Sequence, residues 1–435
     1  MINLFARVLA FVAMTWAYNA QGANNKTSDY DIAGLEKDIR EILDPLSGQK
    51  LISGYFLSIR RYGEPLLDIS EGFADDDSEL KPNSNTLYAV ASMTKPLTAL
   101  AAVKLVSEGR LRLEDPVAKY LNDFSNPLVA LGGSYDSQLE MAEGPMLVRQ
   151  LLTHTSGLTY SSDITGIGDV ARAYKELKIL TLDSNALSQW GDLGGHLSQL
   201  AELPLVAHPG REFNYSVSYD VLSAVIEKVT EEPFDQFMYR EIFEPLGMMS
   251  SYFLVPQEQK KNLATLYAPL IRTFQIPGTP KMYQRSNLLP KKLKNFGLEL
   301  AFASGGTSLV TTADDYQKFL AFLMGSGNPL DLDQESLNLL LEDQTAEEYG
   351  YEMMAKSLGG QAINRTMSLG MGIKYDSLPD GRRIYDYHFW GGAYNTAFWF
   401  DRETGISGVF MTQLYPTRYT VTDKIDSVID KYIGN

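Results

Sequence analysis

The chain has 435 residues, of which 44% are hydrophobic and 21% are charged, a composition typical of a large globular protein and not of a disordered one. Its formal net charge of -16 argues against binding to nucleic acid or to an anionic membrane, because both attract clustered lysine and arginine. Cysteine is absent, which excludes disulfides, thiolate nucleophiles, cysteine metal sites and a lipid anchor on cysteine.

The start of the chain has the pattern of a secretory leader. Residues 1–7 carry one positive charge, residues 8–17 form an apolar stretch too short to span a bilayer, and small residues follow at Ala20, Gly22 and Ala23. The pattern predicts a signal peptide over residues 1–22 and a secreted, periplasmic protein, with a retained membrane anchor as the alternative. No later segment has 18 consecutive apolar residues, so we expect no membrane contact after cleavage.

Strand patterns occur at both ends of the remaining chain, and helical patterns occur between them. Helices are expected over residues 29–46, 94–108, 217–229, 234–243, 313–324 and 421–433, and strands over 51–60, 65–73, 368–375, 382–389, 396–401 and 406–413. This order predicts an α+β fold with one antiparallel sheet built from both chain ends, flanked by helices and interrupted by a mostly helical inserted domain. We expect the two parts of the α/β domain over 23–90 and 297–435, and the helical domain over 91–296.

Ser92 and Lys95 form a Ser-x-x-Lys pair at the predicted start of the second helix. Because proline is tolerated only in the first turn of a helix, Pro96 places the helix start near Met93. The spacing puts both side chains on one face, where the lysine can help to deprotonate the serine, and the helix dipole favours negative charge there. We therefore expect Ser92 to be a nucleophile, with a helix-capping serine as the alternative.

Competing catalytic patterns have weaker support. Two other pairs with the same spacing lie where a helix is expected to end and in an acidic loop, namely Ser47/Lys50 and Ser78/Lys81. The chain has four histidines, and their spacings match no metal-ligand pattern. We therefore expect neither a metal nor a cofactor.

A Ser-Lys pair still needs a proton acceptor, and a tyrosine can fill that role because a nearby cation lowers the pKa of a phenol from about 10. Two tyrosines are candidates. Tyr215 precedes the helix over 217–229, in a loop-to-helix position like that of Ser92. Tyr120 belongs to a Tyr-x-Asn pattern in a turn bounded by Pro116, where a packing role is the simpler interpretation.

Several motifs occur in the order seen in the serine β-lactamase-like superfamily. The chain resembles class C β-lactamases and D-Ala-D-Ala carboxypeptidases, and most closely the family VIII carboxylesterases. The resemblance extends over roughly residues 30–430 and rests on five segments, which are Ala91-Ser92-Met93-Thr94-Lys95, Leu151 to Leu158, Phe213-Asn214-Tyr215-Ser216, Pro245 to Met248 and Gly306 to Tyr316.

The resemblance implies a role for each part of the site. Ser92 would be the nucleophile, Lys95 would assist its deprotonation, and Tyr215 would be the general base that later protonates the leaving group. The third motif would be the segment Trp390-Gly391-Gly392. It would place the backbone N–H of Ala393 opposite that of Ser92 as an oxyanion hole. His388 is interpreted as a strand residue and not as a catalyst.

Two departures from the lactamase pattern bear on the substrate. Val217 stands where the Tyr-x-Asn pattern has its amide, and Trp390 stands where lactamases have a lysine that pairs with the substrate carboxylate. Both changes weaken recognition of anionic amides. Tyr394, Phe398 and Trp399 lie near Trp390 in the sequence and suggest an apolar pocket, although strand aromatics are as often part of the core.

We therefore expect a secreted serine hydrolase, a carboxylesterase acting on small neutral esters through an acyl-enzyme. The alternatives are a β-lactamase, a D-Ala-D-Ala carboxypeptidase or a small-amide hydrolase, and a non-catalytic penicillin-binding or sensor-like relative. The expected partner is a small-molecule ester or amide, and not nucleic acid or a membrane. The sequence does not set the oligomeric state.

Overall fold

The computed structural model describes residues 30–49, 51–136, 138–162, 166, 168–177, 179, 193–269, 283–285, 302–344, 365–377, 383–415 and 421–433. The predicted signal peptide over residues 1–22 lies outside this range, as does Lys50. All the predicted site residues lie within it.

The main sheet has seven strands in the order β2-β1-β13-β12-β11-β10-β9. Its strands are β1 (Gly54–Arg61), β2 (Glu64–Gly72), β9 (Arg365–Met367), β10 (Gly372–Ser377), β11 (Arg383–Gly392), β12 (Thr396–Asp401) and β13 (Ile406–Met411). Every pairing is antiparallel, and the N-terminal strand β1 pairs with the last strand β13, with Phe56 opposite Met411. The predicted α+β fold, with a sheet built from both chain ends, is confirmed.

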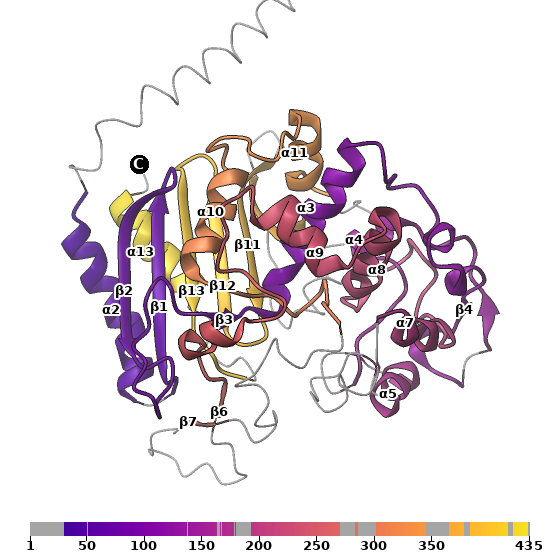
Figure 1. Cartoon of the computed structure of the whole chain (residues 1–435), viewed down its shortest axis with the longest axis horizontal. Helices are drawn as coiled ribbons and strands as arrows, with labels where there is room; N and C mark the ends of the chain where they lie inside the picture. The colour runs from indigo at the N-terminus through magenta and orange to yellow at the C-terminus, as the bar shows by residue number, and fades with distance from the viewer. Residues whose placement is uncertain are drawn as a thin grey trace, which may run out of the picture.

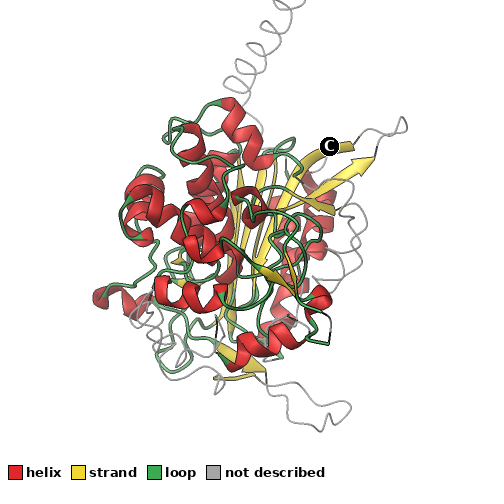
Figure 2. Cartoon of the chain, turned by 90° about the vertical axis from the view of Figure 1, so that its right-hand side faces the viewer, coloured by secondary structure: helices red, strands yellow, loops and turns green. Residues whose placement is uncertain are grey.

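Helices cover both faces of this sheet (Figure 2). On one face, α2 (Ile32–Gly48) and α13 (Thr422–Ile433) pack together, and their apolar stripes share a buried core with Trp399 and Phe410 of the sheet. The stripes consist of residues three or four apart, as expected for amphipathic helices. On the other face, α10 (Ala313–Leu323) packs against β1 and β13.

The remaining helices form the part of the molecule to the right of the sheet in Figure 1. They include α3 (Thr94–Ser107), α4 (Val148–Leu152), α5 (Gly168–Glu176), α7 (Leu193–Ala201), α8 (Ser218–Thr230), α9 (Phe234–Met238) and α11 (Gln334–Leu341). Helix α3 contacts α8 and α11 and is buried over most of its length. It is therefore a central helix and not an amphipathic surface helix.

Three short two-stranded ladders complete the described structure. They pair β3 (Tyr88–Ala89) with β8 (Val310–Thr311), β4 (Leu128–Val129) with β5 (Glu140–Met141), and β6 (Tyr267–Pro269) with β7 (Tyr283–Arg285). Strand β3 lies just before Ser92 in the chain, so its pairing with β8 helps to fix the position of that residue.

Most predicted elements agree with the observed ones to within about three residues at each end, and two differ more. The strand expected over 368–375 is wrong at its start, because a turn at Gly370, with a φ of 85°, separates β9 from β10. The helix expected over 234–243 ends as an α-helix at Met238, and Tyr239–Phe243 continue it as a π-helical turn.

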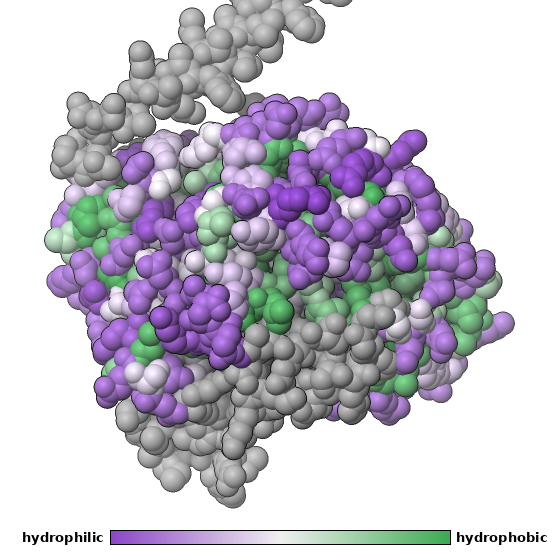
Figure 3. Space-filling view, viewed as in Figure 1, coloured by the Kyte–Doolittle hydropathy of each residue, from purple (hydrophilic) through white to green (hydrophobic). Residues whose placement is uncertain are grey.

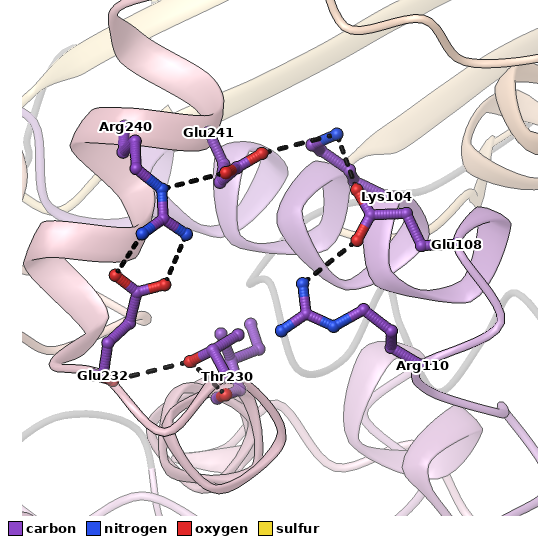
Figure 4. A network of polar contacts seen from close by, with 8 residues as sticks. Lys104, Glu108, Arg110, Thr230, Glu232, Arg240 and Glu241 are labelled. Atoms are coloured by element: carbon purple, nitrogen blue, oxygen red, sulfur yellow. Dashed lines mark hydrogen bonds and ion pairs between the residues drawn. The ribbon is translucent and has the colours of Figure 1, made fainter.

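An ion-pair network joins the π-helical turn to α3 (Figure 4). Lys104 of α3 lies 2.7 Å from Glu108 and 3.5 Å from Glu241, while Arg240 forms two bonds to Glu232. The described residues on the face seen in Figure 3 are mostly hydrophilic. Within the described ranges, no helix is long and apolar enough to cross a membrane.

Candidate active site

Ser92 lies in a tight turn that hydrogen bonds from Thr94 stabilise. The turn is a short 3-10 helix, Ala91–Met93, that leads directly into α3. Ala91 has a φ of 45°, a left-handed conformation that costs a non-glycine residue about 1 kcal/mol. Thr94 compensates by donating its hydroxyl proton to the carbonyl of Ala91 at 2.7 Å and accepting the N–H of Leu309 at 3.1 Å. These bonds hold Ser92 at the N-terminal end of the helix.

Lys95 is fully buried, and its ammonium group has two oxygen partners. Nζ lies 3.1 Å from Ser92 Oγ and 2.9 Å from the carbonyl oxygen of Gly306. A buried charge is costly unless it is hydrogen-bonded, so these two acceptors direct the lysine toward the serine hydroxyl.

Three tyrosine rings surround the ammonium group. Nζ lies 4.9 Å from the ring centre of Tyr215, 5.7 Å from that of Tyr160 and 5.9 Å from that of Tyr219. Burial raises the pKa of both Tyr160 and Tyr219 well above the usual value, and the Tyr219 hydroxyl already donates to the carbonyl of Leu152. Tyr215 is the half-buried one of the three, and its ring is the nearest to the ammonium group. Its role as the general base stays a prediction.

The other tyrosine candidate has different surroundings. Tyr120 donates its hydroxyl proton to Asp115 at 2.6 Å, and its ring lies against Lys119. Burial and the Asp115 carboxylate raise its pKa, which keeps the phenol protonated and so unable to accept the proton of a serine.

The end of β11 lies against the serine turn. The ring centre of Trp390 is 5.9 Å from that of Tyr215. A Cβ atom on Gly392 would lie 2.2 Å from the carbonyl oxygen of Val90, so only glycine allows the strand to approach this closely. The structure thus brings residues 390–392 beside Ser92, and the half-buried Ala393 follows them. Its role as the second oxyanion donor stays a prediction.

The remaining aromatic candidates and His388 belong to the buried interior. His388 is buried, with Nε2 at 2.9 Å from the carbonyl oxygen of Leu341 and its ring stacked on Phe400. Phe398 packs against Tyr316, and Trp399 joins the core beneath α2 and α13. Trp399 is therefore a core residue on the opposite face of the sheet.

Asp220 is a buried carboxylate near the site that the sequence analysis did not identify. It lies in the first turn of α8, accepts a hydrogen bond from Ser304, and is 1% exposed. Burial raises its pKa to about 6, although Ser304 and the charge of Lys95 act in the opposite direction. Ser304 Oγ also accepts the N–H of Gly306 at 3.2 Å, which links Asp220 to the carbonyl that binds Lys95. An aspartate on the apolar stripe of the helix, three residues after Val217 and four before Ala224, was the signal that could have revealed it.

No group of three or more potential metal ligands occurs among the residues that the structure describes. The arrangement instead combines a half-buried hydroxyl, a buried ammonium group and a phenol, the parts needed for nucleophilic acyl transfer.

Comparison with known proteins identifies the class. The family model described as Beta-lactamase matches residues 39–427, and the chain belongs to this family. It is a serine hydrolase of the β-lactamase fold.

Two curated relatives match almost the whole chain. Protein Rv1367c of Mycobacterium tuberculosis is 29% identical over 405 residues, which cover 89% of this chain and 91% of the relative. Esterase EstB of Burkholderia gladioli is 28% identical over 402 residues, which cover 88% of this chain and 91% of the relative.

Solved structures share the fold. EstCE1, described as a hydrolase with promiscuous acyltransferase activity, has a TM-score of 0.70 at 24% identity and covers 93% of this chain and 99% of its own. Simvastatin synthase LovD of Aspergillus terreus has a TM-score of 0.70 at 21% identity, and the match covers 93% of this chain and 98% of LovD.

Proposed function

We propose that the protein is a carboxylesterase that hydrolyses small neutral esters through an acyl-enzyme on Ser92. The observation that carries the proposal is the position of Lys95 Nζ, which lies 3.1 Å from Ser92 Oγ and 4.9 Å from the ring centre of Tyr215. The similarity to Esterase EstB supports esterase activity over the other reactions of the family.

In the proposed reaction, Ser92 Oγ attacks the ester carbonyl carbon while its proton passes to the phenolate oxygen of Tyr215, which the ammonium group of Lys95 stabilises. The backbone N–H groups of Ser92 and Ala393 stabilise the tetrahedral oxyanion, and each such donor contributes about 3 kcal/mol to lowering the barrier. The tetrahedral intermediate then breaks its bond to the alcohol, which takes the proton from Tyr215. Water then attacks the carbonyl carbon of the acyl-enzyme and gives a proton to Tyr215. The bond to Ser92 Oγ breaks, the acid leaves, and Tyr215 returns that proton to Ser92 Oγ.

The preference for neutral esters rests on the residues beside the serine. Trp390 offers an apolar indole where the lactamase pattern has a cation, so a substrate carboxylate would find no lysine at this position. An ester also loses its alcohol more easily than an amide loses its amine. Trp390, Gly391 and Gly392 would therefore contact the acyl or alcohol group of a small uncharged ester.

The test compares two substrates on one preparation. The wild-type protein should hydrolyse p-nitrophenyl butyrate with a higher kcat/KM than nitrocefin, and a fluorophosphonate probe should label Ser92, as read by peptide mass spectrometry. The Ser92→Ala variant should lose both ester hydrolysis and labelling while keeping its melting temperature. Undiminished hydrolysis by this variant would remove Ser92 from the mechanism, and a preference for nitrocefin would favour the lactamase alternative.

Secretion to the periplasm is also part of the proposal and rests on the leader pattern in residues 1–22. N-terminal sequencing of the protein recovered from the periplasmic fraction should begin within a few residues of Ala23. A protein retained in the cytoplasm with residue 1 intact would contradict this.

A further inference from the structure

His154 is a fully buried histidine beside the site that the proposed reaction does not use. It follows α4 and has a φ of 55°, a left-handed conformation that is uncommon outside glycine and that asparagine, aspartate and histidine adopt more often than other residues. Its imidazole ring lies 4.6 Å from the ring of Tyr215, centre to centre, and 5.2 Å from the ring of Tyr219. It is thus part of the wall around the proposed general base.

Hydrogen bonds join His154 to the residues on either side of Tyr215. The backbone carbonyl of His154 accepts the N–H of Asn214 at 2.8 Å. Its ring nitrogen Nδ1 accepts the N–H of Ser216 at 3.2 Å and lies 3.3 Å from the hydroxyl oxygen of the same residue. One residue therefore holds the backbone both before and after the tyrosine.

The protonation state of His154 fits this arrangement. Because Nδ1 accepts a backbone N–H, we assign the ring proton of the neutral imidazole to Nε2. Burial and the charge of Lys95 lower the pKa of His154 well below its usual value, so the ring stays neutral. A protonated ring would carry a proton on Nδ1 and could no longer accept the N–H of Ser216.

We propose that His154 is a positioning residue for Tyr215, which clamps the backbone at Asn214 and Ser216 and sets the phenol against the ammonium group of Lys95. The proposal rests on the proposed function, in which Tyr215 exchanges a proton with Ser92. His154 does not touch the reacting atoms. It acts by fixing a phenol that would otherwise turn about its backbone, and a misplacement of about 1 Å in such a group costs about 100-fold in rate.

Asparagine and leucine provide a matched pair of substitutions. The two side chains have nearly the same shape, but only asparagine has a carbonyl oxygen that can accept the N–H of Ser216 in place of Nδ1. Asparagine also tolerates the left-handed backbone of residue 154. We expect His154→Leu to lower kcat for p-nitrophenyl butyrate about 100-fold with little change in KM, and His154→Asn to recover at least about tenfold of that loss.

The split between kcat and KM provides a readout that general destabilisation would not move. A displaced Tyr215 should lower kcat and leave KM nearly unchanged in His154→Leu, and His154→Asn should restore kcat.

A double-mutant cycle with Tyr215→Phe separates the two proposals. If His154 acts through Tyr215, His154→Leu should have little further effect in the Tyr215→Phe background. An equal loss in both backgrounds would overturn the positioning role and leave the proposed function intact. Full activity in Tyr215→Phe alone would overturn the role of Tyr215 as the base, and with it the inference about His154.

Folding of each variant is checked by near-UV circular dichroism and thermal melting. If His154→Leu does not fold, His154→Asn carries the test. The inference requires a folded Asn variant to keep kcat within about tenfold of the wild type, because its acceptor is retained. A folded Asn variant with a loss greater than about tenfold would overturn it.

Discussion

Replacing Gly392 with alanine is expected to push the end of β11 away from the turn that carries Ser92. The new Cβ atom would lie 2.2 Å from the carbonyl oxygen of Val90 and 2.3 Å from Thr396 Oγ1. An ordinary carbon–oxygen contact is about 3.3 Å, so one of the two segments must move by about 1 Å. A displacement of this size within the site should lower kcat/KM about 100-fold, while overpacking should destabilise the fold by about 1 to 3 kcal/mol.

The assay is hydrolysis of p-nitrophenyl butyrate at a temperature where circular dichroism shows the variant to be folded. Gly54→Ala is the matched control, because its Cβ would lie 2.4 Å from the backbone nitrogen of Phe73. Gly54 belongs to β1, which β13 and β12 separate from β11. We expect the control to lose a similar amount of stability and to keep its activity. Wild-type activity in folded Gly392→Ala would refute the idea that close approach of β11 to the serine turn sets the site geometry.

Three further predictions concern charged groups. Lys95→Met should lower kcat/KM for the ester by about 1,000-fold without lowering the melting temperature, because it removes a buried cation and keeps most of its volume; a large loss of stability would contradict this. The raised pKa of Asp220, about 6 against a usual 3.8, means that the folded state takes up a proton more readily than the unfolded state. Its contribution should therefore lower the unfolding free energy by about 3 kcal/mol as the pH rises from about 4 to 7, and urea titrations of Asp220→Asn should lack this decrease. Lys104→Met breaks the partly exposed ion pairs to Glu108 and Glu241. It should change the unfolding free energy by less than about 1 kcal/mol and leave ester hydrolysis unchanged. A change in unfolding free energy that persists at high salt would argue against an ionic origin.

The sequence predicted the main sheet well because its signals are local. Apolar runs and hairpin turns near both chain ends indicated the strands that pair as β1, β2 and β11 to β13. The pattern failed at β9, because a three-residue strand is too short to show periodicity and Gly370 reverses the chain directly after it. The π-helical turn after Met238 was also missed, because a single π-helical turn leaves the spacing of the apolar residues almost the same as in an α-helix.

For the site, the distance along the chain decided what could be predicted. Ser92 and Lys95 are one helical turn apart, so their proximity follows from helix geometry. Tyr215 could be proposed from its position before a helix, but the choice between it and Tyr120 needed the resemblance. The placements of His154 and Asp220 could not be derived, because each acts through contacts with segments far away in the sequence.

The pairing of β1 with β13 affects how the chain can fold during synthesis. The β1–β2 hairpin leaves the ribosome first, yet one edge of β1 has no partner until the last strand of the sheet is made. Its buried apolar side chains would be exposed during that interval, which makes the nascent chain prone to aggregation. A protein shortened at its C-terminus before β13 should therefore accumulate as an insoluble product and not as a smaller folded enzyme.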